Sequence, residues 1–465
     1  MKRLTLIILM IPMMIFAQQN LTLDQCRELA LENNHQIKIA EENIQSAEHG
    51  VKSSRTAFLP KISLVGSYTR MNKKFKYSID EMALPISNAD GTYTADQLNV
   101  ITNADGSATM TPKNWIHIPS MDLKIGQENI YLLDLALVQP LFMGGKIMQQ
   151  YNISKSAAKI SKAQKSLTNS EVLVKTDEYY WQIVSVEHKL ELAHEYVNLI
   201  NTHITELEEY MVEGLITNND MLKAKVKLNE AKINLLKAEN GCALLKMALY
   251  QHIGLPLKSQ IKLADNEFLE YSSVNSDIDD DEFLSSREEL KILQESVNIS
   301  KSLEKIAYSQ YMPNVVITSN YYTLNPNPYN SLKDEFGSDW NVGISAQFDI
   351  FGWNDRGHKV AIARHSRKAA EQQFEDSKNM IRLDIQQATY RISESMKQIY
   401  LADATFVQAD ENLRVTQDNF KEGLTTSTDV LDAQILWQKS KSEAIDSKSE
   451  YRINLSKYYK AIGQK

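Results

Sequence analysis

Two stretches of the chain place apolar or small residues at alternating spacings of three and four. In the first stretch these positions are Ile183, Val186, Leu190, Ala193, Val197, Ile200, Ile204, Leu207 and Met211. In the second, 209 residues later (183 to 392), they are Ile392, Ser395, Ile399, Ala402, Phe406, Ala409, Leu413, Thr416 and Phe420. We call these positions the seam, because they alternate as the a and d positions of a coiled coil do. The pattern predicts two long helices, each packed along one stripe.

A short motif follows each stretch and predicts a helical hairpin. It occurs as EGLITNNDMLKA at 213–224 and as EGLTTSTDVLDA at 422–433. Gly214 and Gly423 can adopt the left-handed conformation that ends a helix. Asp220 and Asp429 are expected to be the N-caps of the returning helices, along which the seam resumes. The chain is therefore expected to contain an internal two-fold sequence repeat, with one antiparallel coiled-coil hairpin in each half.

The prolines set the lengths of these helices. None of the ten lies between Pro140 and Pro256 or after Pro328, and an interior proline would break a helix. The hairpins are predicted at 146–254 and 355–463, with first helices at 146–212 and 355–421. Each first helix would be roughly 100 Å long at 1.5 Å per residue. Such lengths favour a fibre, a strut or a tube over a compact globular core.

The clearest strand pattern spans 340–350, where apolar and polar residues alternate. Its apolar positions are Trp340, Val342, Ile344, Ala346, Phe348 and Ile350. Eleven residues is the length of a strand that crosses a bilayer, so Trp340, Val342, Ile344, Phe348 and Ile350 are predicted to face lipid. A half-buried strand of a soluble sandwich is the alternative. Further strands are expected at 62–70, around 131–137 and at 315–323. Four strands are too few to close a barrel, so several copies would have to share one.

The remaining segments complete the domain organisation. Residues 1–17 are predicted to be a secretory signal peptide, with Lys2 and Arg3 before an apolar run that ends at Ala17. The first structural repeat is expected at 18–255, a linker at 256–286 and the second repeat at 287–465. Residues 72–129 are expected to form a long polar outer loop with two Asn-Ala-Asp-Gly turns. The acidic run at 276–282 is expected to be a solvated loop.

Charge and side-chain chemistry argue against catalysis and against nucleic acid as a partner. The formal net charge is −8, and about −10 once Lys2 and Arg3 are removed. The nine histidines form no HExxH motif, and the chain has no glycine-rich phosphate loop and no nucleophile elbow. Two lone cysteines, Cys26 and Cys242, make neither a disulfide framework nor a zinc site. The protein is predicted not to be an enzyme and to need no cofactor and no metal.

Four motifs give the chain its resemblance to a known family, over essentially the whole mature length. They are LTLDQCRELALENN at the start, AFLPKISLVGSY entering the first strand, LVQPLFMGG leaving the second, and the paired GLxTxxD motifs. With the duplication, the chain resembles the TolC-like outer-membrane efflux proteins of Gram-negative bacteria. The resemblance implies a homotrimer whose twelve-stranded barrel lies in outer-membrane lipid, with a helical tunnel in the periplasm. It also implies a passive conduit that meets a periplasmic adaptor protein and an inner-membrane transporter.

The resemblance also assigns roles to the residues of the hairpin motifs. It implies adaptor-docking tips at Gly214, Leu215, Thr217, Asp220, Gly423, Leu424 and Thr426, and a pore-entrance constriction at Asp429, Asp432 and Phe420. Capping explains Asp429, because Asp220 matches it in the first repeat. Lys223 matches Asp432, so the turn itself does not require a carboxylate there, which favours a pore role. Phe420 either gates the pore or continues the seam, and packing is the interpretation we favour.

A periplasmic coiled-coil scaffold, or an adaptor protein without a pore, is the alternative function. Both would use long hairpins, but neither has a use for strands with one lipid-facing side. The alternating strands therefore favour the conduit.

Overall fold

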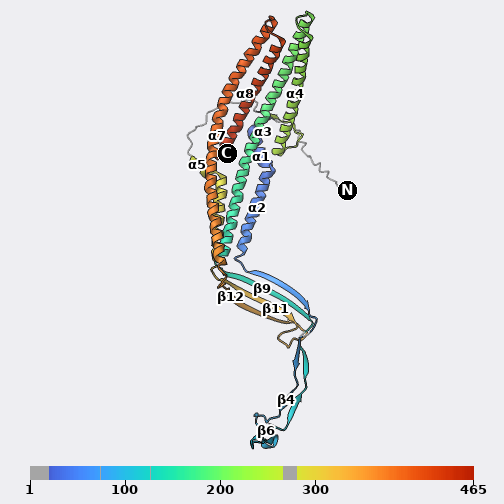
Figure 1. Ribbon diagram of the computed structural model, residues 1–465, viewed down its shortest axis with the longest axis vertical. Coiled ribbons are helices and arrows are strands. Elements are labelled where there is room, and N and C mark those ends of the chain that lie inside the picture. Colours follow the sequence, from blue (N-terminus) through green and yellow to red (C-terminus); the bar gives the residue numbers. More distant parts are fainter. Residues whose placement is uncertain (1–19, 74, 126, 265–279, 465) are drawn as a thin grey trace, which may run out of the picture. The chain divides into compact units, whose positions relative to one another are not determined.

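The computed structural model describes residues 20–73, 75–125, 127–264 and 280–464 (Figure 1). The predicted signal peptide and the first residues of the acidic run, 276–279, lie outside these ranges. The chain divides into two compact units, one built from the long helices and the other, residues 55–147 and 308–354, built from strands.

The helical unit contains two hairpins of equal dimensions. The first pairs α3 (Lys146–Val212) with α4 (Asn218–His252), and the second pairs α7 (Asp355–Lys421) with α8 (Ser427–Ala461). Their helices have 67 and 35 residues in both cases, and the predicted bounds of the two first helices are confirmed. Shorter helices precede the strands: α1 (Leu23–Asn33), α2 (His35–Thr56), α5 (Asp280–Ser286) and α6 (Glu288–Ser309). A small parallel pair joins β1 (Asn20–Leu21) to β10 (Lys262–Leu263).

The seam positions are buried or half-buried as predicted, except for Met211, which is exposed. Ile200, Leu207 and Ile392 are core residues, and free Cys242 is buried on the same seam. The seam serines can also be buried, because their hydroxyls donate to carbonyls of their own helices. These bonds run from Ser395 to Arg391 (2.7 Å), from Ser440 to Trp437 (3.0 Å) and from Ser447 to Ala444 (3.0 Å).

The base of each hairpin is fixed in the same way, by a glycine in the left-handed conformation and by a polar side chain. Gly254 and Gly463 adopt left-handed φ values of 77° and 74°. A Cβ on Gly254 would lie 2.4 Å from Asn33, and one on Gly463 would lie 2.2 Å from Ser286. Only glycine therefore fits at either base.

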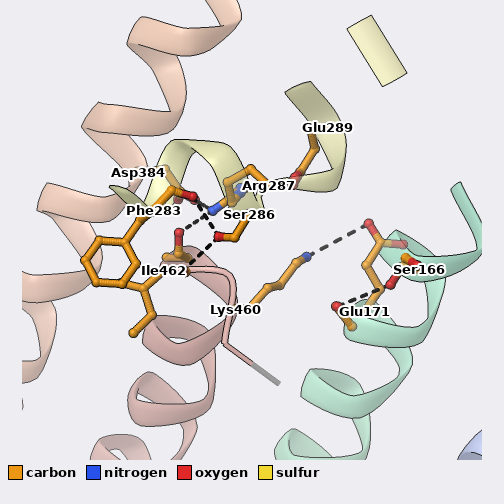
Figure 2. Close-up of polar contacts among 11 residues, drawn as sticks. Ser166, Glu171, Phe283, Ser286, Arg287, Glu289, Asp384, Lys460 and Ile462 are labelled. Atoms are coloured by element: carbon orange, nitrogen blue, oxygen red, sulfur yellow. Dashed lines mark hydrogen bonds and ion pairs between the residues drawn. The ribbon is translucent and has the colours of Figure 1, made fainter. Parts of the chain in front are cut away.

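The second feature is a polar side chain that lies between two short helices, α1 and α2 in the first half and α5 and α6 in the second. It binds the C-terminal end of the returning helix. Asn34 Nδ2 donates to the His252 carbonyl (2.9 Å), and Arg287 Nη1 donates to the Ala461 carbonyl (2.6 Å). Figure 2 shows the corner at Arg287, where Asp384 and Glu289 face the guanidinium group. The two halves thus anchor their hairpins in the same way.

Polar contacts join α8 to α3 across the two hairpins, in addition to an apolar cluster near the tips that includes Ile204, Val430 and Leu431. Ser449 Oγ donates to the Trp181 carbonyl (2.8 Å), and Lys189 Nζ lies 2.6 Å from Asp446. Towards the hairpin ends, His203 Nε2 lies 3.0 Å from Ser427 Oγ. The two hairpins are thus joined by hydrogen bonds, an ion pair and apolar packing.

The second unit is built on a four-stranded antiparallel sheet in the order β12-β11-β9-β2. Its strands are β2 (Lys61–Arg70), β9 (Asn129–Met143), β11 (Asn314–Asn325) and β12 (Gly337–Gln347). The register brings most of the large apolar residues of the four strands onto one face. These are Ile62, Leu64, Tyr68, Tyr131, Leu133, Leu135, Leu137, Val315, Ile317, Tyr321, Trp340, Val342 and Ile344. The opposite face is mostly polar and includes Ser63, Ser67, Asp134, Asn320, Asn341 and Ser345.

The strand predicted at 340–350 is displaced by three residues. It begins at Gly337 and ends at Gln347, so Phe348 and Ile350 lie beyond the strand and the prediction for these two residues is corrected. Gln347 pairs with Asn314, the first residue of β11. The preceding residue is Pro313, which has no N–H to continue the ladder, so the pairing stops there.

The predicted outer loop at 72–129 is wrong in its character, since about half of it is paired as β-ribbon. Three two-stranded segments follow one another: β3 (Phe75–Ile79) with β8 (Met121–Ile125), β4 (Met82–Pro85) with β7 (Trp115–Ile118), and β5 (Leu98–Thr102) with β6 (Ala108–Pro112). A short 3₁₀ turn, η1 (Ala95–Gln97), precedes β5. Both Asn-Ala-Asp-Gly turns are confirmed, because Gly91 N–H and Gly106 N–H donate to the carbonyls of Asn88 (2.9 Å) and Asn103 (3.0 Å).

No helix within the described residues has a stretch both long and apolar enough to span a bilayer.

Candidate functional site

The candidate site lies at the two hairpin tips, which we define as residues 213–220 and 422–429. Gly214 and Gly423 both adopt φ of 75° and end α3 and α7 in the left-handed conformation, as predicted. Leu215 N–H then bonds back to the Tyr210 carbonyl (2.9 Å), and Leu424 N–H to the Asn419 carbonyl (2.8 Å). Each tip is thus a tight helix stop that leaves one leucine, Leu215 or Leu424, exposed to solvent.

The returning helices are capped by threonine, which corrects the prediction that Asp220 and Asp429 are the N-caps. Thr217 and Thr426 are the N-caps, and the two aspartates lie three residues later in complete capping boxes. Asp429 Oδ2 accepts from the Thr426 N–H (2.8 Å) and from its hydroxyl (2.7 Å). The threonine hydroxyls hold the pKa values of Asp220 and Asp429 below their ordinary range. Both carboxylates are therefore committed to the turn.

Asp432 is placed differently from Asp429. Its neighbours Leu431 and Ala433 are buried, whereas Asp432 is exposed on the outward side of α8. It has no hydrogen-bond or ion-pair partner among the residues that the structure describes. Its carboxylate is free to act on an ion or a partner.

Phe420 belongs to the core between the hairpins. Its ring packs against His203 and Tyr210, with ring centroids 5.2 and 5.5 Å apart, and it is buried. This burial favours the packing interpretation over a place at a pore constriction.

A polar groove lies between the two tips. Its volume is about 580 Å³, and its lining includes Tyr210, Ile216, Asp220, Lys223, Thr425 and Thr428. Lys223 Nζ crosses the groove to donate to Thr428 Oγ1 (3.3 Å) and lies 3.6 Å from Asp220. Hydroxyls, two amines (Lys223 and Lys421) and one carboxylate thus converge on a concave surface that can bind a polar protein segment.

Sequence reasoning missed His203, which contacts both Phe420 and the first residue of α8. Its Nδ1 has no hydrogen-bond partner, and the carboxylate of Glu206 lies 3.6 Å away. Burial lowers the pKa of His203, and the negative charge of Glu206 offsets part of this effect. The signal in the sequence is a histidine that directly flanks a seam position, Ile204.

The site holds no metal-binding group. Across the described ranges, no three His, Cys, Asp or Glu side chains gather as metal ligands would.

Comparison with known proteins places the chain among outer-membrane channels. The family model described as outer membrane efflux protein matches residues 26–255 and 281–464. Outer membrane protein TolC of Vibrio cholerae is 17% identical over 313 residues, which cover 66% of this chain and 70% of TolC.

Solved structures show the same fold. VceC of Vibrio cholerae superposes with a TM-score of 0.70 at 15% identity, covering 95% of this chain and 96% of VceC. The CmeC outer membrane channel of Campylobacter jejuni gives 0.71 at 17% identity, covering 95% and 85%. The family match supports a location in the outer membrane of a Gram-negative bacterium. The match spans both halves of the chain, and the chain belongs to the outer membrane efflux protein family.

Proposed function

We propose that three copies of this outer-membrane efflux protein form one channel that conducts substrate passively to the outside. An inner-membrane transporter and a periplasmic adaptor would deliver the substrate to the tips. The observation that carries this proposal is the four-stranded sheet, which has one apolar face and two unpaired edges, β2 and β12. An open sheet edge is not tolerated in lipid, and four strands cannot close on themselves.

Three sheets joined edge to edge would give twelve strands, and the exposed apolar sheet face would then contact outer-membrane lipid. The polar residues of the opposite face would line the pore. A periplasmic scaffold would instead expose this apolar face to water, which argues against that alternative.

The helices support the same assembly. A second stripe of α4, separate from the seam, exposes Leu222, Val226, Ile233, Leu236 and Leu244. Their spacings of four, seven, three and eight residues keep them on one side of the helix. Since the described part of the chain leaves this stripe uncovered, a neighbouring copy is the partner we propose for it.

The tips are the proposed docking site for the adaptor. Gly214, Leu215, Thr217, Gly423, Leu424 and Thr426 shape the two turns and the groove between them, and Asp220 closes the first cap. Two exposed leucines beside a hydroxyl-lined groove offer one apolar contact on each side of a polar surface. The equal hairpins also support two repeats, at 18–255 and 287–465, joined by the linker 256–286.

Asp432→Asn is expected to weaken the cation preference and the divalent-cation block of single channels in planar bilayers. Three copies of Asp432 around an axis would form a ring of negative charge, which attracts cations at a pore entrance. Glu443→Gln is the matched control, because Glu443 is an exposed carboxylate three turns further along α8. Unchanged selectivity and block in Asp432→Asn would remove this residue from the entrance, while the channel itself would stand.

A further inference from the structure

The outermost part of the chain's β-ribbon carries an apolar face that the assembly described above does not use. We define the outer ribbon as residues 82–118, which contain the β4–β7 and β5–β6 pairs. The register places Met82, Leu84, Ile116 and Ile118 on one side of the first pair and Leu98, Val100, Met110 and Pro112 on one side of the second. Ile86 continues the first set, since Ile86 N–H bonds to the Asn114 carbonyl (2.9 Å).

This face is apolar and uncharged, and much of it is exposed. Met82, Leu84, Val100, Met110 and Ile116 are all exposed to solvent. The opposite side carries Asn99, Thr109, Thr111 and His117, with Ile101 and Trp115 as its large apolar residues. Exposed apolar patches such as those on the two strand pairs mark an interaction surface.

The ribbon also needs a partner for its own stability. Each of its segments is a two-stranded sheet, and no third strand or helix covers it within the described chain. A two-stranded sheet is marginally stable in water unless a further layer covers its apolar side. The ribbon is thus half of a packed structure.

We propose that the other half is the same ribbon in the neighbouring copies, so that the outer ribbons of three copies pack together as a collar over the outer mouth of the channel. This inference rests on the proposed trimer. The ribbon grows out of β2 and β9, since Met71 N–H still bonds to the Glu128 carbonyl (2.7 Å) beyond the ends of those strands. β2 is an edge of the sheet, so each ribbon would leave the barrel at a boundary between copies.

The dimensions allow the ribbons to meet. Twelve strands spaced about 4.8 Å apart and tilted by about 40° give a barrel roughly 24 Å across. Residues 108–118 of the outer ribbon are about 37 Å long at 3.4 Å per residue. This length exceeds the barrel radius of roughly 12 Å, so the ribbon can reach from the barrel wall to the central axis. The uncharged face also brings no like charges together when identical copies meet. A ring of apolar side chains at the mouth would narrow the water path there.

Cysteine cross-linking in whole cells tests the collar with matched controls from the same strand pairs. The full-length chain with Cys26→Ala and Cys242→Ala would carry M110C or I116C on the apolar face, or T111C or H117C on the opposite face. Identical residues that pack around an axis can come within the 7 Å Cα separation that a disulfide needs. We expect disulfide cross-links between copies in the M110C and I116C variants, and none in the T111C and H117C variants.

Three results would overturn the collar. They are equal cross-linking from both faces, free labelling of M110C and I116C by a membrane-impermeant maleimide without cross-links, and cross-links of these cysteines to a different protein. The trimer is assessed on the same samples by its heat-modifiable migration. Trimers without cross-links would reject the collar alone, whereas the absence of trimers would reject the proposed assembly as well.

Discussion

Arg287→Ala is expected to cost about 3–5 kcal/mol of the stability of the helical unit, the largest effect of any single substitution considered. The Arg287 side chain is only 7% exposed. Its guanidinium group donates to the Ala461 carbonyl (2.6 Å) and to both carboxylate oxygens of Glu289 (3.1 and 2.9 Å), and it lies 3.5 Å from Asp384. Removing it leaves the end of α8 and a partly buried carboxylate without their donor (Figure 2).

Thermal unfolding of the purified protein, followed by helical circular dichroism, measures this loss as a lower midpoint. Arg287→Lys is expected to fall between the wild type and alanine, because one ammonium group cannot replace the planar fork.

Arg414→Ala is the matched control for burial. Arg414 also binds two carboxylates, Glu411 (2.8 and 2.7 Å) and Asp418 (2.9 Å), but its side chain is 61% exposed. Exposed ion pairs of this kind contribute little to stability, because water and salt screen their charges. Equal shifts of the midpoint for Arg287→Ala and Arg414→Ala would contradict the anchoring role of Arg287.

Acidification from about pH 7.5 to about pH 5.5 is expected to loosen the contact between the two hairpins near their tips. His203 is 2% exposed and connects α3 to Ser427, the first residue of α8. The ring faces Glu206 from its own helix, Phe420 from α7 and Ser427 from α8. A protonated ring would therefore bury a positive charge with a single carboxylate nearby, which destabilises the closed contact.

The direction follows from the lowered pKa of His203. When the contact opens, the ring returns to its ordinary pKa of about 6.5, so the open form binds a proton more readily. The contact is fully stable above that pH and loses stability as the pH falls towards the lower pKa of the closed form, by up to about tenfold in the opening equilibrium per pH unit. Hydrogen exchange at residues 427–430, corrected for intrinsic rates, measures this opening.

Two substitutions test whether His203 is the group that causes the acid response. His203→Phe keeps an aromatic ring beside Phe420 but cannot be protonated, so its opening should not depend on pH in this range. His188→Phe is the matched control, because His188 also has a glutamate three residues later (3.5 Å) but is 32% exposed. If His203→Phe retained the acid response of the wild type, another group would be responsible.

The helices could be predicted well because one local pattern determines them. The seam repeats over many turns, and an unbroken heptad pattern without proline fixes both the type and the length of a helix. The bounds of α3 and α7 agree with the prediction for this reason. The tips were placed correctly by Gly214 and Gly423, but threonine and aspartate are both good N-caps, and only the reciprocal bonds of the capping box decide between them.

The strands and the cross-hairpin contacts could be predicted only in part. Alternation identified β12, yet its end depends on Pro313, the residue before the neighbouring strand β11, and the sequence pattern of β12 alone does not reveal that neighbour. The strands of the ribbon at 75–125 were not predicted, because each paired run has only four or five residues between polar turns. The contact between His203 and Ser427 depends on how two hairpins pack, which neither seam specifies alone.

The number of chains in the particle extracted from outer membranes tests the central claim most directly. Light scattering or native mass spectrometry, corrected for bound detergent, should give three chains that separate only on heating, because each sheet needs its neighbours to close. A single chain that stays folded and soluble in water without detergent would contradict the shared barrel, and with it the proposed channel.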